Sequence, residues 1–120
     1  MIRIPQHANG RLIDFNDLLA EVDRFLRVDH WRFQVSECLG DGADAIEERS
    51  WDGEVLGDAE LRALYRGIYQ TINGRFVGHQ AGQPVCELEA VDSSFWTVSG
   101  PAGLEDRLRD LHGEWQPATR

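Results

Sequence analysis

The side chains of this sequence that could do chemistry are concentrated in one segment. Residues 37–60 carry nine acidic side chains and a single base, Arg49, so the segment has a net charge of −8. The nine acids are Glu37, Asp41, Asp44, Glu47, Glu48, Asp52, Glu54, Asp58 and Glu60. Carboxylates at this density can bind a hard cation such as Ca²⁺ or Mg²⁺, or they can attract a basic protein.

The spacing of these acids does not match a calcium loop. An EF-hand loop that began at Asp41 would need oxygen ligands at its third and fifth positions and glycine at its sixth. Ala43, Ala45 and Ile46 occupy those positions. The four histidines also lack HxH or HExxH spacing, so we predict no metal site. The looser cation site that the acids would still allow consists of Asp41, Asp44 and Glu48.

The rest of the chain offers no recognisable catalytic set. There is no lysine, which excludes Schiff-base chemistry and a Walker A loop. Ser93 and Ser94 are not part of a GxSxG elbow, and Cys38 and Cys86 belong to no CxxC pattern. We predict that both cysteines are buried free thiols, that the protein is not an enzyme and that it needs no cofactor.

Trp51 lies inside the acidic segment, directly before Asp52. An aromatic side chain surrounded by charged ones has the composition of an interface hot spot, in which a desolvated aromatic anchor has a polar rim. The alternative is that Trp51 folds back onto the core as a lid. The sequence leaves both interpretations open.

Composition limits the classes of function. The chain has 120 residues, a net charge of −9 and 42% hydrophobic residues, which is typical of a single globular domain. A nucleic-acid-binding protein needs a basic footprint, and this sequence has none. No apolar run is long enough to span a membrane, and the N-terminus does not resemble a secretory signal, so we predict a cytoplasmic protein.

Apolar periodicity predicts the elements that position these side chains. Residues 15–26 place apolar side chains at helical spacing after Asp14 as N-cap, and residues 30–39 alternate as a half-buried strand. The pair Asn73-Gly74 favours a type I′ turn between two strands. The other expected elements are an extended lead-in over 1–13, a short strand over 43–51, a helix capped by Asp58, strands over 68–72, 75–79, 84–91 and 94–99, and a helix that starts at Pro101 and ends at Gly113.

Runs of antiparallel strands with helices packed on one side define an α+β domain. We therefore predict one α+β domain over residues 1–120. Its antiparallel sheet should have about five strands, including a C-terminal four-strand meander, and its helices should pack mainly on one face.

The charge distribution favours a binding function over catalysis. We predict a small acidic binding protein, of the kind that acts as an immunity protein or inhibitor, which docks a basic protein partner through residues 37–60. The alternatives are a small enzyme or ligand-binding domain that uses a polar sheet face around Arg32, Glu87 and Glu89, and a homodimer or other homo-oligomeric structural subunit. The residues predicted to bind the partner are Asp41, Asp44, Glu47, Glu48, Trp51 and Asp52.

Overall fold

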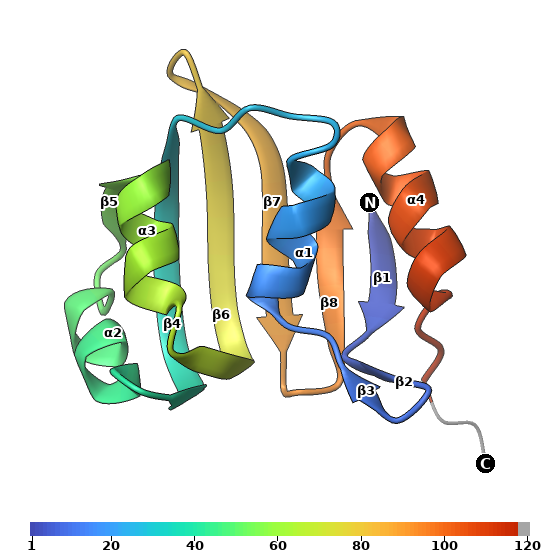
Figure 1. The fold of residues 1–120 in the computed structure, drawn as a ribbon, viewed down its shortest axis with the longest axis horizontal. Coiled ribbons are helices and arrows are strands. Elements are labelled where there is room, and N and C mark those ends of the chain that lie inside the picture. Colours follow the sequence, from blue (N-terminus) through green and yellow to red (C-terminus); the bar gives the residue numbers. More distant parts are fainter. Residues whose placement is uncertain (118–120) are drawn as a thin grey trace.

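A computed structural model describes residues 1–117 (Figure 1). The strands are β1 (Ile2–Pro5), β2 (His7–Ala8), β3 (Arg11–Leu12), β4 (His30–Gly40), β5 (Glu54–Gly57), β6 (Ile68–Gln80), β7 (Gln83–Val91) and β8 (Phe95–Ser99). The helices are α1 (Phe15–Val22), α2 (Ala43–Arg49), α3 (Asp58–Tyr65) and α4 (Ala102–His112). None of these helices is long and apolar enough to cross a membrane.

Six strands form one antiparallel sheet in the order β1-β8-β7-β6-β4-β5, and β2 and β3 form a separate small ladder. Figure 1 shows α1 and α3 in front of this sheet, α4 beside β1, and α2 near the end of β4 at the opposite edge. The predicted α+β class, with helices on one face of an antiparallel sheet, is confirmed. No helix among residues 1–117 covers the other face of the sheet, where Trp115 packs on Phe95 of β8.

The core forms where the helices meet the sheet. The predicted alternation in β4 is confirmed, since Trp31, Phe33 and Val35 are buried while the side chains between them are exposed. Phe15, at the start of α1, stacks on Phe76 of β6 with a centroid separation of 3.9 Å and meets the edge of Trp31 at 5.5 Å. One aromatic cluster therefore joins α1 to β6 and β4.

The N-terminus of α1 has the expected acidic cap. The backbone N–H of Asp14 donates to the Asp17 carboxylate at 2.9 Å, which is the reciprocal contact of a capping box. The helix itself ends at Val22, earlier than the predicted stripe through Leu26.

The predicted turn at Asn73-Gly74 is wrong, and residues 68–80 form one continuous strand. A type I′ turn needs positive φ at both central residues, and neither residue has one. Gly74 is instead required by packing, because a Cβ there would lie 2.9 Å from Cγ2 of Thr71. The chain reverses later, at Ala81-Gly82, where both φ angles are positive, so the C-terminal meander has three strands.

One other local prediction is also wrong. Residues 43–51 were expected to form a strand, but they contain α2, in which Ile46 is the buried side chain. The strand that pairs with this edge of β4 is β5. The expected lead-in contains β1, which pairs with β8 at the other edge of the sheet.

Candidate functional site

The acidic segment extends along the β5 edge of the sheet. α2 follows the end of β4, and β5 then runs back along it, so that Glu54 lies opposite Phe33 and Gly57 lies opposite His30. The acids around α2 and the acids at the start of α3 are therefore at opposite ends of this edge. The segment presents two separate groups of carboxylates instead of a single patch.

At the α2 end, most of the carboxylates face solvent. Asp44 and Glu48 lie one turn apart on the side of α2 opposite the buried Ile46, and both are exposed. Asp41 and Asp52, before and after the helix, are also exposed. Among residues 1–117, none of these four carboxylates forms an ion pair.

Glu47 differs from its neighbours. It is half-buried, and its Oε2 accepts a hydrogen bond from the backbone N–H of Cys38 at 3.1 Å. Glu54, further along, pairs with Arg49 at 2.7 Å. Both carboxylates are thus occupied within the chain. The remaining predicted partner-binding residues are exposed on α2 or within two residues of its flanking turns, and we name them the α2 patch: Asp41, Asp44, Glu48, Trp51 and Asp52.

Trp51 is held away from the core. Its side chain is 73% exposed, so the interpretation of Trp51 as a lid is wrong. The backbone on both sides is fixed, because Gln34 Nε2 donates to the Trp51 carbonyl at 2.8 Å and the Val35 N–H donates to the buried Ser50 Oγ at 2.9 Å. A shallow hollow of about 410 Å³ lies beside Trp51, lined by Gln34, Val35 and Ser36 among others. The aromatic ring therefore protrudes from a rigid turn.

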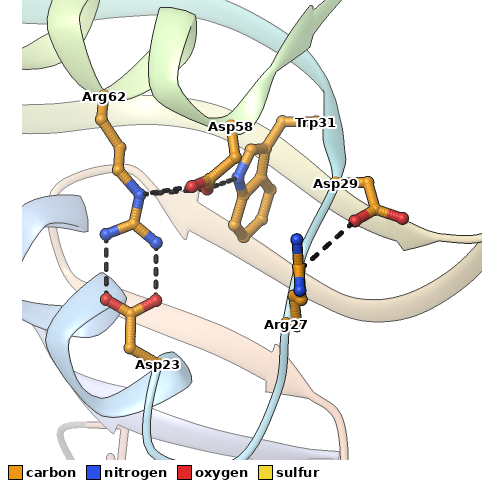
Figure 2. A network of polar contacts seen from close by, with 6 residues as sticks. All are labelled: Asp23, Arg27, Asp29, Trp31, Asp58 and Arg62. Carbon is orange, nitrogen blue, oxygen red and sulfur yellow. Dashed lines mark hydrogen bonds and ion pairs between the residues drawn. The ribbon is translucent and has the colours of Figure 1, made fainter.

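The other end of the segment contains a polar network that the sequence did not reveal (Figure 2). Asp58, the first residue of α3, accepts hydrogen bonds from Trp31 Nε1 at 2.8 Å and from Arg62 Nε at 3.0 Å. The two Nη atoms of Arg62 donate to the two carboxylate oxygens of Asp23, at 2.9 and 2.6 Å. Hydrogen bonding to Asp23, followed by that to Asp58, raises the pKa of Arg62 above its ordinary value.

This Asp23–Arg62–Asp58 clamp joins the C-terminal end of α1 to the start of α3. Only the Asp58–Arg62 pair has a sequence signal, since the two residues are four apart on one helix. Asp23 lies 39 residues from Arg62, and nothing in the local sequence indicates their contact.

A hollow of about 640 Å³ lies beside the clamp. Asp29 and Arg27 line it and are 4.0 Å apart, and Asp29 Oδ2 also accepts the N–H of Ala81 at 2.9 Å. Figure 2 shows Arg27 next to Asp29 and Arg62 between its two aspartates. Asp58, Asp23 and Asp29 are bonded within the chain, so their contribution is structural, whereas Glu60 is exposed and forms no ion pair within residues 1–117.

The uncovered face of the sheet carries the residues of the alternative prediction. Arg32 and Glu87 line one hollow of about 630 Å³, together with Arg75 and Val77. Arg75 forms an ion pair with Glu87. Glu89 lies opposite Arg75 in the ladder but does not line this hollow. The structure thus brings together two of the three residues that the sequence placed on this face.

The thiols are unsuited to nucleophilic chemistry. Cys38 and Cys86 are both buried and unbonded, as predicted. Burial, reinforced by the negative charge of Glu47, raises the pKa of Cys38 to about 12, and burial raises that of Cys86 to about 11. Both are therefore protonated at neutral pH. Within residues 1–117 no three His, Cys, Asp or Glu side chains are grouped in a way that could hold a metal ion.

Comparison of the chain with protein-family models, with curated proteins and with solved structures finds no match. Any functional argument therefore starts from the surfaces described above.

Proposed function

We propose that this protein is a non-catalytic binding domain, of the inhibitor or immunity type, that docks a basic protein through the α2 patch. The observation that carries the proposal is the exposed ring of Trp51 on a rigid turn, beside Asp52 and directly after a helix whose exposed acids form no ion pair within residues 1–117. A large exposed aromatic side chain costs solvation free energy unless a partner covers it.

The geometry of the turn favours tight binding. Trp side chains are enriched among interface hot spots, and a ring carried on backbone that is already fixed requires no ordering of that backbone when a partner covers it. The hydrogen bonds from Gln34 and to Ser50 provide this pre-organisation. Trp51 would then be the central anchor of the interface.

The charge of the patch indicates the partner's chemistry. Asp41, Asp44, Glu48 and Asp52 have no cation of their own within residues 1–117, so their field extends into solvent. Such a field accelerates encounter with a positively charged surface and disfavours acidic partners. The partner is therefore a protein with a basic face that has room for an indole ring.

The proposal can be tested by affinity capture from the native cell extract with the immobilised chain. Three forms are compared: the wild type, Trp51→Ala, and a patch variant in which the four carboxylates become amides (D41N, D44N, E48Q, D52N). Glu47 is left unchanged because it bonds the backbone of Cys38. A captured basic protein is then purified and its affinity for each form measured by calorimetry.

We expect Trp51→Ala to weaken binding about 30-fold, as for a hot-spot anchor, and the patch variant to bind weakly with a reduced dependence on salt. The control makes the same change in net charge by removing four exposed carboxylates near the other edge of the sheet (D92N, D106N, D110N, E114Q), of which Asp106 and Glu114 pair with Arg109, and it should bind like the wild type. If the control loses affinity equally, net charge alone explains binding. If the patch variant and Trp51→Ala bind normally, the proposal is wrong.

A further inference from the structure

The sheet face that no helix covers has a concave region over β6 and β7. Its hollow of about 630 Å³ has the size typical of small-molecule sites. Val77 and Val85 form the floor, and Pro84 adds an apolar side. Arg32 of β4 stands at one side of the hollow, and Arg75 and Glu87 also line it.

Arg32 is the unusual feature of this hollow. Among residues 1–117 no carboxylate lies within 4.0 Å of its guanidinium group, although the chain has a net charge of −9. Asp52 lines a smaller adjoining hollow of about 100 Å³ with Arg32 without pairing with it. Arg75, in contrast, is neutralised by Glu87. Arg32 therefore provides an uncompensated positive charge.

The position of the Arg32 side chain is defined by its contact with the turn after Trp51. A Cβ atom added to Gly53 would lie 3.6 Å from both Nε and Nη2 of Arg32. Gly53 has a φ of +81°, a conformation that favours glycine and leaves this space for the guanidinium. The group is thus supported on one side by backbone.

We propose that this hollow binds a small amphipathic anion, a carboxylate with an apolar body. The planar guanidinium of Arg32 matches a carboxylate in bidentate geometry. The apolar body of the ligand would lie on Val77 and Val85 and remove them from water. Glu87, already paired with Arg75, would repel a second negative charge, which favours a monoanion. The site is distinct from the α2 patch and does not depend on it.

The test uses the full chain and three probes of equal chain length: octanoate, octanol and octylammonium. Binding is measured by titration calorimetry and by amide chemical-shift changes in NMR spectra. We expect octanoate to bind in the millimolar range or tighter, as about ten non-hydrogen atoms allow, with shifts centred on Val77 and Val85. Octanol should bind at least about tenfold more weakly, because it cannot form the charged pair. Octylammonium should not bind.

The matched variants are Arg32→Gln and Arg66→Gln. Arg66 is also an exposed arginine without an ion pair among residues 1–117, but it lies at the end of α3 and does not line this hollow. Arg32→Gln should weaken octanoate binding at least about tenfold, whereas Arg66→Gln should change it less than twofold. Circular dichroism of both variants would verify that the fold is intact.

Three results would overturn the proposal. The first is the absence of octanoate binding up to its solubility limit. The second is equal binding of octanol and octanoate, or of Arg32→Gln and the wild type, which would make the hollow a merely apolar surface. The third is a dimer, detected by analytical ultracentrifugation, that Arg32→Gln disrupts, because the face would then belong to a second copy of the chain.

Discussion

At the α3 end of the acidic segment, Asp58 is bonded to both Arg62 and Trp31, whereas at the α2 end Asp44 and Glu48 face solvent and form no ion pair within residues 1–117. The two groups of carboxylates have the same chemistry. They differ in their tertiary neighbours, since Arg62 reaches Asp23 across the gap between α3 and α1, whereas no arginine within residues 1–117 forms an ion pair with the α2 patch.

A count of charges in the sequence does not distinguish paired carboxylates from unpaired ones. Internal pairing at the α3 end links two helices, whereas the carboxylates of the α2 patch, which form no ion pair within residues 1–117, leave negative charge exposed to solvent. An acidic segment is therefore available to a basic partner only where the fold does not pair its carboxylates internally. We therefore expect substitutions at the α3 end to lower the free energy of unfolding, and substitutions at the α2 end to leave it nearly unchanged.

The largest expected effect comes from breaking the clamp. In Arg62→Met the aliphatic stem is kept and the guanidinium is lost, which leaves Asp23 without its bidentate partner and Asp58 with Trp31 alone. We expect the free energy of unfolding to fall by about 2 kcal/mol, because hydrogen bonds between charged groups are lost at a half-buried position. Urea denaturation followed by circular dichroism measures the change.

Arg49→Met is the control for this prediction. Arg49 pairs with Glu54, but its side chain is 48% exposed, and exposed ion pairs contribute little. The control should lose no more than about 0.5 kcal/mol. Equal losses in the two variants would mean that the clamp is an ordinary surface pair, and the contrast between the two ends would disappear.

Elements with a strong apolar period could be predicted from the sequence. Residues 15–22 and 30–40 have one buried face each, and burial of that face determines both the element and its orientation. α2 could not be predicted in this way, because Ile46 is its single buried side chain and one apolar position defines no period. Its helical form is set by the way the loop packs beside β4.

Long-range packing explains the other failures. Asn73-Gly74 has the residues of a turn, but Gly74 faces Val35 and Thr71 so closely that the strand must continue through it. β1 forms by pairing Ile2 with Val98, a contact that no local pattern indicates. The same limit applies to the site: residue types identified the acids, but only the fold separates those that are paired from those that are free.

Asp14 differs from the carboxylates at both ends of the acidic segment because it is buried. Its Oδ1 accepts the N–H of Thr71 at 2.8 Å, while Oδ2 has no hydrogen-bond partner among the described residues. Burial raises the pKa of Asp14 above its ordinary value of 3.8. The folded state thus holds this proton more tightly than the unfolded state does, and ionisation of Asp14 lowers stability as pH rises from 3.8 through the folded-state pKa.

Asp14→Asn removes this titration and keeps an oxygen acceptor for Thr71. The stability of the variant relative to wild type should therefore increase as pH rises through that interval and become constant above the folded-state pKa. We expect the change to be smaller than that in Arg62→Met, since the hydrogen bond to Oδ1 remains. Urea denaturation of both proteins across the acid range measures it. If the stability difference between the variant and the wild type does not vary with pH, or varies in the opposite direction, the pKa of Asp14 is not raised in the folded state.

The smallest expected effect belongs to the α2 patch. When D41N, D44N, E48Q and D52N are combined, two small terms oppose each other. Removing like charges from a chain with a net charge of −9 relieves repulsion, whereas Asp44 loses a favourable position in the first turn of α2. We expect the free energy of unfolding to change by less than about 0.5 kcal/mol, and the change to shrink further in high salt.

A stability change this small would allow an effect on partner binding to be distinguished from an effect on folding. The four carboxylates have no ion-pair partner within residues 1–117, so their removal breaks no such contact. Any loss of partner affinity in the same variant then reports on the surface itself. If urea denaturation instead showed a loss above about 1 kcal/mol, the α2 patch would hold the fold together as the clamp does, and the two ends would not differ.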